Sequence, residues 1–275
     1  MAFRYLPMTE KDQKEMLKTI GVKSVDELFE EIPESVRFQG RLNVPEAIPE
    51  PLLFKKMQQM AKRNLSTENC ISFLGAGAYE HYIPSVVQHI VSRAEFYTAY
   101  TPYQPEISQG ELQAMFEFQT MICELTGMDV ANSSMYDGST AVAEAANLAV
   151  SGTDRKKLLI SQALHPEAKQ ILQTYAKGRD WQVIEIPCKD GRTHLEQLQQ
   201  QVDQKTAAVI IQSPNFLGVL EDLEKASSIA HAVQSLLVVS ANPLSLGILK
   251  PPGEFGADVV VGDVQPLEIG RASCR

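Results

Sequence analysis

Two short apolar runs, Ala207-Ala-Val-Ile-Ile-Gln212 and Leu236-Leu-Val-Val-Ser240, decide the fold. Each run has the length of a β-strand and is rich in β-branched residues, whereas residues 222–234 between them have helical spacing. A strand, a helix and a second buried strand in succession are typical of a parallel sheet that is covered on both faces. The two runs therefore predict an α/β domain.

The same alternation of strand and helix extends through residues 129–261. Further strands are expected at residues 129–132, 157–161, 182–186 and 258–261, and further helices at residues 139–150, 166–178 and 195–202. Helices of this length between short strands indicate three layers, with helices on both faces of a mainly parallel sheet. We assign this large domain to residues 67–267.

The first 66 residues have a different pattern, with helical spacing at residues 10–19, 25–31 and 51–64. Thr9 and Ser24 are suitable N-caps, and Ser24 with Glu27 matches a capping box. The segment has too little apolar sequence to form a core of its own. We interpret residues 1–66 as an N-terminal helical arm, which either wraps around the large domain or a partner chain, or packs on itself as a cap.

Charge and composition argue against several classes of function. The net charge of −9 and the pI near 5.2 disfavour nucleic acid or an anionic membrane as the main partner. No stretch resembles a signal peptide or approaches the length of a membrane span. The four cysteines form no C-x-x-C pair, which predicts free thiols in a cytoplasmic protein. The histidines lack the spacing of a metal site, so no metal is expected.

The last residues, Glu268-Ile-Gly-Arg-Ala-Ser-Cys-Arg275, break from the preceding pattern. They read like translated sequencing-adapter DNA. We therefore interpret residues 268–275 as a non-native tail and base no functional argument on Cys274 or Arg275.

The most unusual stretch is Phe96-Tyr-Thr-Ala-Tyr-Thr-Pro-Tyr-Gln-Pro-Glu-Ile-Ser-Gln-Gly110. Its two prolines predict a stiff, non-helical loop. Ser108 with Glu111 predicts a capping box that begins a helix, and Gly127 is the expected stop. The apolar residues expected to be buried by this helix are Leu112, Met115, Phe116, Ile122 and Cys123.

A rigid loop of this kind can hold phenol and amide groups in fixed directions, as a binding site requires. The alternative is an ordinary surface loop whose tyrosines pack on the core. Under the first interpretation the candidate substrate-binding residues are Tyr97, Tyr100, Tyr103, Gln104, Glu106, Ser108 and Gln109.

This loop resembles the signature loop of glycine decarboxylase, the P-protein of the glycine cleavage system. The upstream Phe73-Leu-Gly-Ala-Gly-Ala-Tyr79 is similar to a second motif of that family, and it predicts a tight turn before a helix that follows Pro84. The start of the chain and the residues after Ser240 look most like subunit 1 of the split bacterial form. Members of the family continue well past residue 275, so the resemblance implies a C-terminally truncated chain.

The resemblance implies the large domain of a pyridoxal-phosphate (PLP)-dependent transferase, the aspartate aminotransferase fold type I, here incomplete. It implies an enzyme that decarboxylates glycine and passes the aminomethyl group to the lipoyl group of H-protein. Subunit 1 would act with a PLP-bearing subunit 2 in a heterotetramer of two plus two. PLP is therefore expected in the partner subunit and not in this chain.

The residues themselves agree poorly with PLP binding in this chain. A PLP enzyme needs a lysine for the Schiff base and usually a carboxylate at the pyridine nitrogen. In this fold the carboxylate follows the strand at residues 236–239, where the chain reads Ser240-Ala-Asn242, and the lysine follows the last strand, where it reads Gly262-Asp-Val-Gln-Pro-Leu267. Relics of a cofactor site are candidates at Ser139, Thr140, His165 and Asn215.

Each relic also has a purely structural interpretation. Ser139 and Thr140 begin a helix, whose free N–H groups can bind an anion or be capped by Asp137. His165 fits the start of a helix, and Asn215 fits a turn. Two other functions remain open: a stand-alone PLP enzyme, and a non-catalytic subunit that stabilises or regulates a partner.

Overall fold

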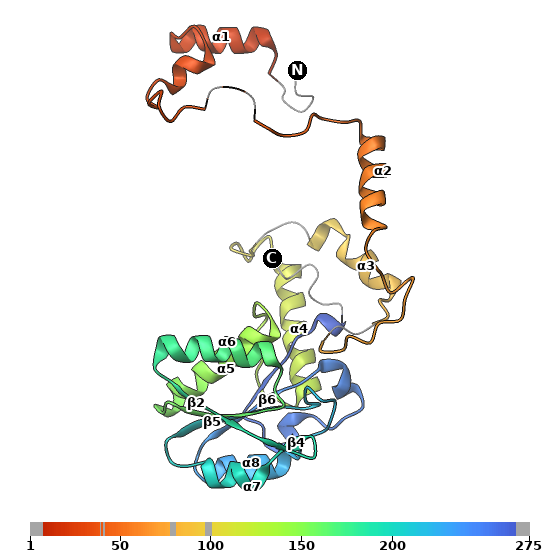
Figure 1. The fold of residues 1–275 in the computed structure, drawn as a ribbon, viewed down its shortest axis with the longest axis vertical. Helices are drawn as coiled ribbons and strands as arrows, with labels where there is room; N and C mark the ends of the chain where they lie inside the picture. The colour runs from red at the N-terminus through yellow and green to blue at the C-terminus, as the bar shows by residue number, and fades with distance from the viewer. Residues whose placement is uncertain (1–7, 39, 41, 78–80, 97–100, 268–275) are drawn as a thin grey trace. The chain divides into compact units, whose positions relative to one another are not determined.

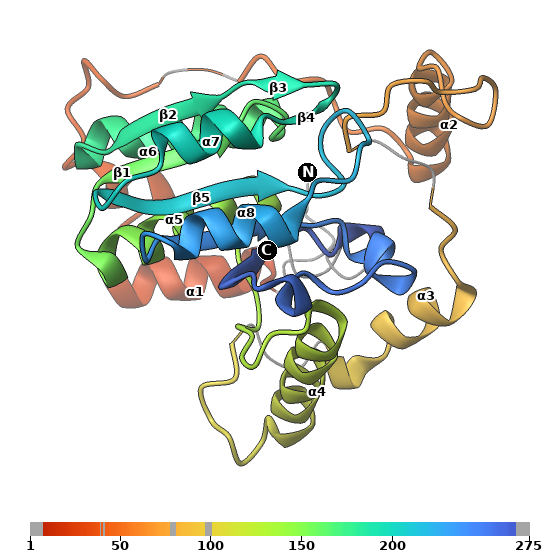
Figure 2. The same ribbon diagram turned by 90° about the horizontal axis from the view of Figure 1, so that it is seen from below.

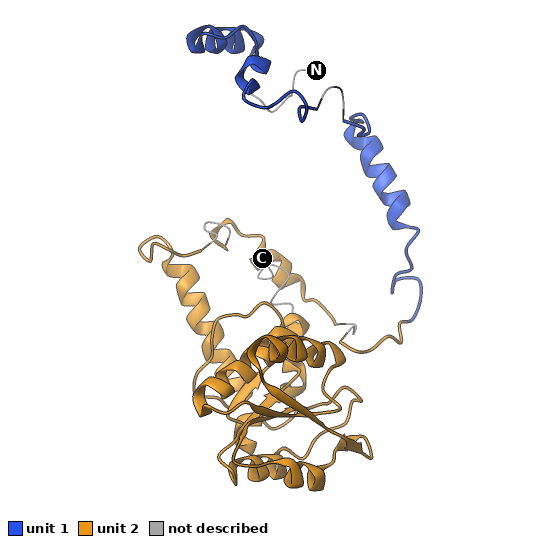
Figure 3. Cartoon of the chain, turned by 60° about the vertical axis from the view of Figure 1, so that its left-hand side comes forward, with its two compact units in different colours: residues 1–71 blue, residues 72–275 orange. Residues whose placement is uncertain are grey.

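The computed structural model describes residues 8–38, 40, 42–77, 81–96 and 101–267. The chain divides into two compact units, residues 1–71 and residues 72–275 (Figure 3). The proposed tail at 268–275, which includes Cys274, lies outside the described residues, as do residues 78–80 of the glycine motif.

The first unit contains helix α1 (Glu10–Ile20), the 3-10 helix η1 (Val25–Phe29) and helix α2 (Glu50–Ala61). Thr9 caps α1 in a capping box with Asp12, and Gly21 ends the helix in the left-handed conformation with φ 91°. None of the described residues of this unit is buried. The apolar side chains of α2 are accordingly exposed: Leu52, Leu53, Phe54, Met57 and Met60. What the arm packs against remains a prediction.

The second unit contains a five-stranded sheet in the order β2-β1-β5-β6-β7 (Figure 1). Every pair of neighbouring strands is parallel. The strands are β1 (Lys157–Ser161), β2 (Gln182–Ile186), β5 (Thr206–Gln212), β6 (Leu236–Ser240) and β7 (Val259–Val261). A short antiparallel ribbon, β3 (Cys188–Lys189) with β4 (Arg192–Thr193), follows β2. The predicted strands at 157–161, 182–186, 207–212, 236–240 and 258–261 are confirmed.

Helices cover both faces of this sheet, which gives the expected three layers. Helices α5 (Gly138–Thr153) and α6 (Pro166–Arg179) lie on one face, and α7 (Leu195–Gln201) and α8 (Leu223–His231) lie on the other (Figures 1 and 2). Successive strand residues alternate between the two cores: Ile210 packs with the α5 and α6 side, whereas Val209 and Ile211 pack with the α7 and α8 side.

The remaining elements of the second unit are helix α3 (Ser85–Val91), helix α4 (Gln109–Thr126) and four 3-10 turns. The predicted helix after Pro84 and the predicted stop at Gly127, which has φ 71°, are both confirmed. The 3-10 turns are η2 (Ala94–Phe96), η3 (Pro243–Gly247), η4 (Pro252–Phe255) and η5 (Gln265–Leu267). No helix in the described part of the chain is both long and apolar enough to cross a lipid bilayer.

Two local predictions near α4 are wrong. Ser108 makes no side-chain cap to α4; it is buried, and its own N–H donates to the carbonyl of Pro105 at 3.2 Å. The turn that begins at Pro105 therefore sets the conformation of Ser108, with φ −114° and ψ 20°, instead of the extended geometry of a capping box.

The apolar face of α4 is also less buried than its pattern predicts. Phe116 is 66% exposed, and Leu112, Met115, Ile122 and Cys123 are only partly buried. Thr126 is the single buried residue of this helix. The helical spacing identified the apolar face correctly, but spacing does not tell whether another element covers it.

Two further local predictions are wrong. Residues 129–132 form no strand, and Val130 is 84% exposed. A strand requires a neighbour for its backbone groups, and this run has only two apolar residues to secure one. The capping box at Ser24 is incomplete: Ser24 accepts from the N–H of Glu27, but the Glu27 carboxylate accepts from Lys23, and residues 25–29 are a 3-10 helix.

Cys70, Cys123 and Cys188 are free thiols, as expected for these three residues.

We expect Gly253→Ala to destabilise the second unit. A Cβ atom at Gly253 would lie well inside van der Waals contact with the carbonyl group of Gly127, and backbone atoms cannot move aside as a flexible side chain can. The expected loss is about 1–3 kcal/mol in the free energy of unfolding, measured from the urea midpoint. The matched control is Gly152→Ala, which has no atom within 4 Å and lies in helix α5. An unchanged midpoint for Gly253→Ala would show that the Gly127 turn is free to move.

We also expect Arg155→Met to weaken the sheet at the amino end of β1. Arg155 Nη1 donates to three carbonyl oxygens, those of Thr206 at 3.1 Å, Val233 at 2.9 Å and Gln234 at 3.0 Å. Loss of these charged donors should lower the free energy of unfolding by about 1–3 kcal/mol, as measured by urea denaturation. The control is Lys156→Met, because Lys156 pairs with Asp180 at the surface and such pairs contribute less than about 1 kcal/mol. Equal effects of the two substitutions would contradict this assignment.

Candidate functional site

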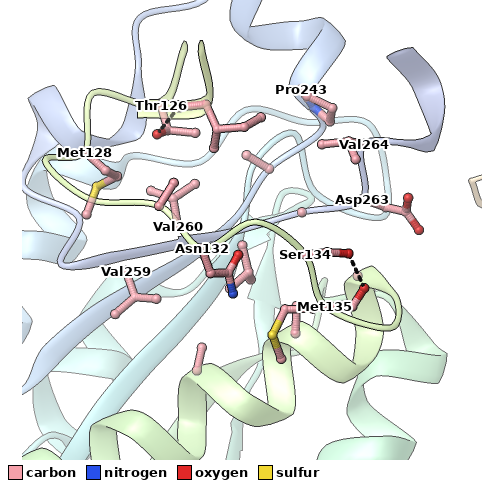
Figure 4. Close-up of a pocket in the computed structure, with 18 of the residues that line it drawn as sticks. Thr126, Met128, Asn132, Ser134, Met135, Pro243, Val259, Val260, Asp263 and Val264 are labelled. Carbon is pink, nitrogen blue, oxygen red and sulfur yellow. Dashed lines mark hydrogen bonds between the residues drawn. The ribbon is translucent and has the colours of Figure 1, made fainter. Parts of the chain in front are cut away.

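A hollow of about 550 Å³ lies in the second unit beside strand β7 (Figure 4). Its wall comes from the carboxyl half of α4, the segment 128–138, one face of α5 and the turns after β6 and β7. The lining is mainly apolar, with Met128, Met135 and Val260 among its members, and Asp137, Glu144 and Asp263 supply carboxylates. None of the predicted site residues that the structure describes lines this hollow.

The residues of the aromatic loop are only partly described. Tyr97 and Tyr100 lie outside the described residues. Tyr103 is 85% exposed, and Gln104, Glu106 and Gln109 are exposed as well, whereas Ser108 is buried. Local turns hold this part of the loop, with the N–H of Tyr103 donating to the carbonyl of Thr101 at 2.8 Å. A binding role for these side chains remains a prediction.

The start of helix α5, where Ser139 and Thr140 lie, is capped by the protein itself. Asp137 Oδ1 accepts from the N–H of Thr140 at 2.8 Å, and Asp137 Oδ2 accepts from the Thr140 hydroxyl at 2.9 Å. Asp263 lies next to it, because a Cβ atom at Gly138 would be 3.1 Å from the Asp263 Cβ atom. Asp137 thus takes the place of an anion as the acceptor at this helix start, and the negative charges of Asp137 and Asp263 disfavour a phosphate group there.

The ends of β6 and β7 also lack the groups that hold PLP. At the end of β6, Asn242 uses its side-chain oxygen to accept from the N–H of Leu244 at 3.0 Å, so it caps the turn η3. After β7, Asp263 accepts from the N–H of Gln265 at 2.8 Å, and residues 262–267 include no lysine. The residues at these three positions do not fit PLP, and we derive no chemical step through it in this chain.

His165 caps helix α6 and contacts two other loops. Its Nδ1 accepts from the N–H of Glu167 at 3.2 Å, and its Nε2 lies 3.2 Å from the carbonyl oxygen of Ala76. The ring also packs edge-on against Phe216, with the centroids 5.2 Å apart. The geometry therefore matches the structural interpretation of His165, as a residue at the start of a helix.

Asn215 is 4% exposed and has every polar atom of its side chain bonded. Its amide nitrogen donates to the carbonyl of Gly191 and to Glu221 Oε1, both at 2.8 Å, and its oxygen accepts from the N–H groups of Leu217 and Val219, both at 3.0 Å. Because no donor or acceptor of Asn215 is left for a ligand, it acts as the centre of a turn.

Sequence reasoning missed Glu221, which joins this turn to the β3–β4 ribbon. Both carboxylate oxygens of Glu221 accept from the N–H of Thr193, at 3.2 and 2.9 Å, and the Thr193 hydroxyl donates to Ser161 at 2.8 Å. Burial, with Glu221 nearby, raises the pKa of the Cys188 thiol above its usual value. These residues come from separate segments, so no local motif could have identified the network.

A metal centre is not evident in the residues that the structure describes, since they contain no group of three or more His, Cys, Asp or Glu side chains arranged to hold an ion.

Two sequence relatives are bacterial proteins named as glycine dehydrogenase subunits. The chain is 62% identical over 269 residues to the probable glycine dehydrogenase (decarboxylating) subunit 1 of Bacillus cereus strain B4264, and 63% identical to the protein of the same name from Bacillus mycoides. Each alignment covers 98% of this chain and 60% of the relative. The chain thus spans about three fifths of the length of these relatives.

Solved structures give the same fold. A crystal structure of glycine decarboxylase (P-protein) of the glycine cleavage system, in inhibitor-bound form, superimposes with a TM-score of 0.86 at 45% identity, over 96% of this chain and 59% of that one. A NifS-like protein superimposes with a TM-score of 0.54 at 15% identity, over 70% of this chain and 54% of that one. At this low identity the likeness supports the fold, PLP-transferase fold type I, and carries no argument about function. The family model of the glycine cleavage system P-protein matches residues 3–272, and the chain belongs to that family.

Proposed function

We propose that this chain acts as subunit 1 of a glycine dehydrogenase (decarboxylating) in the glycine cleavage system. The observation that carries the proposal is the 62% identity, across 98% of the chain, to proteins named as that subunit. The joint enzyme decarboxylates glycine and transfers the aminomethyl group to the lipoyl group of H-protein. The acidic charge and the free thiols are compatible with a cytoplasmic enzyme.

A subunit numbered 1 implies a partner, and we propose that the partner carries PLP. Two features of this chain support that division. Asp137 and Asp263 lie beside the helix start where a cofactor phosphate would bind. Residues 240–242 offer no carboxylate to the pyridine nitrogen, and residues 262–267 offer no lysine for the Schiff base. The partner is a homologous subunit 2, in a heterotetramer of two plus two.

In this arrangement the chain supplies residues that line or support the active site, and the partner supplies the cofactor. Bound in the partner, PLP supplies the electron sink for decarboxylation. We propose that the aromatic loop at residues 97–109 lines or supports the shared site, where it orients glycine and excludes water. The stiffness that its prolines impose supports this role, because a site held within fractions of an ångström requires rigid support.

Two other functions make different predictions. A stand-alone PLP enzyme would bind the cofactor without a partner, and the misfit at α5, β6 and β7 disfavours it. A stabilising or regulatory subunit would assemble with the partner without contributing to turnover. It would therefore tolerate changes in the aromatic loop.

Reconstitution separates these functions. The full-length chain and its PLP-bearing partner should each be assayed alone and in mixture for glycine-dependent release of CO2 with lipoylated H-protein. We expect activity in the mixture only, and the absorbance of PLP in the partner only. Bound PLP or activity in this chain alone would overturn the proposal in favour of the stand-alone enzyme. Full activity of the partner alone would favour the regulatory subunit.

The substitution Tyr100→Phe tests whether the aromatic loop contributes to turnover. Removal of one hydroxyl that bonds the reacting groups should lower turnover by about ten-fold, the equivalent of one well-placed hydrogen bond, while assembly is unchanged. The control is Tyr82→Phe, because Tyr82 is 87% exposed and lies outside the loop. Turnover and the elution volume of the mixture on size-exclusion chromatography provide the two readouts. Loss of assembly in place of turnover would give the loop a structural role only.

A further inference from the structure

We propose that His165 is a positioning residue that fixes the turn at residues 75–77 against the carboxyl edge of the sheet. In parallel α/β sheets the ligand sites lie at this edge, where the loops after the strands meet. His165 follows β1, and Phe216, which contacts its ring, follows β5. Ala76 comes from a segment 89 residues earlier in the chain. His165 is thus the point at which three separate segments meet at that edge.

The hydrogen-bond partners of His165 match one tautomer of its ring. A backbone N–H can only donate, so the Nδ1 that faces Glu167 N–H at 3.2 Å is an acceptor without a proton. A carbonyl can only accept, so the Nε2 that faces Ala76 at 3.2 Å carries the proton. In the tautomer with its hydrogen on Nε2, one ring nitrogen caps helix α6 while the other holds the turn. A further hydrogen bond fixes the backbone of His165: its backbone N–H donates to Gln212 Oε1 at 2.9 Å.

The turn that His165 holds has an uncommon backbone conformation. Gly75, Ala76 and Gly77 have φ values of 60°, 53° and 94°. The glycines adopt such values without cost, but an alanine does so only when its surroundings impose it. The Nε2 atom of His165 bonds the carbonyl oxygen of Ala76, which is the residue with the strained backbone. It is therefore placed to maintain the turn.

This turn belongs to the second motif of the family, Phe73-Leu-Gly-Ala-Gly-Ala-Tyr79, and its apolar residues are presented outward: Phe73 is 93% and Leu74 is 81% exposed. We infer that a fixed turn contributes to the joint active site, an inference that rests on the proposed function. His165, a candidate relic of a cofactor site, would thus have a structural role of its own, because both of its ring nitrogens lie against protein groups.

The two roles of His165 can be separated by two substitutions. In His165→Gln the side-chain amide nitrogen is near the position of Nε2, so it keeps the donor to Ala76 and loses the cap. In His165→Asn the amide oxygen is near the position of Nδ1, so it keeps the cap for α6 and loses the donor to Ala76. Each variant is therefore the control for the other.

The first readout is the rate at which chymotrypsin cleaves after Phe73, measured by mass spectrometry on the intact chain. We expect cleavage about five-fold faster in His165→Asn than in wild type, the effect of one lost hydrogen bond on local opening, and a wild-type rate in His165→Gln. Melting temperature should follow the opposite order, with a loss of about 2–4 °C in His165→Gln only. Equal cleavage rates in the two variants, or a faster rate in His165→Gln, would overturn the positioning role.

The second readout uses the full-length chain mixed with its PLP-bearing partner. We expect His165→Asn to lower kcat/KM for glycine about five-fold and His165→Gln to restore it to near the wild-type value. A cleavage contrast with unchanged kinetics would show that the turn is held but takes no part in the site. If the wild-type mixture shows no glycine-dependent activity, the proposed function fails, and the cleavage contrast still decides whether His165 holds the turn.

Discussion

Burial of both faces of the parallel sheet is the constraint on which the second unit depends. The side chains of β1, β5 and β6 alternate between two cores, and Leu158, Ile210 and Val238 on one face are as fully buried as Leu159 and Leu237 on the other. Because water reaches neither face, polar groups gather where the strands end. The bonds of Asn215, Glu221 and His165 all lie in the loops that follow β1 and β5, and these three residues therefore lie at one edge of the sheet.

Helices and strands whose own residues have a clear hydrophobic periodicity could be predicted from the sequence. The strand at 207–212 and the helix at 166–178 each have their own periodicity, and tertiary packing agrees with it. The failures depend on groups distant from the motif. Residues 129–132 needed a neighbouring strand, and Ser108 would cap α4 only if the turn at Pro105 left its backbone extended.

The same distinction applies to the candidate site. The sequence identified His165 and Asn215 as residues with a special position, because each follows a buried strand. It could not identify their partners: Ala76 is 89 residues from His165, and Gly191 is 24 residues from Asn215. The sequence alone did show that residues 262–267, which follow β7, include no lysine. The acidic surroundings of the α5 start became evident only when Asp137 and Asp263 were seen next to each other.

The outer edge of β7 has a consequence for how the chain associates. Among the described strands β7 pairs only with β6, and its residues, Val259-Val-Val261, include none of the charges or prolines that prevent pairing at an exposed edge. The hollow beside it already provides an apolar wall. No described strand pairs with the outer side of β7, so this is the place where a further strand would join the sheet through backbone hydrogen bonds.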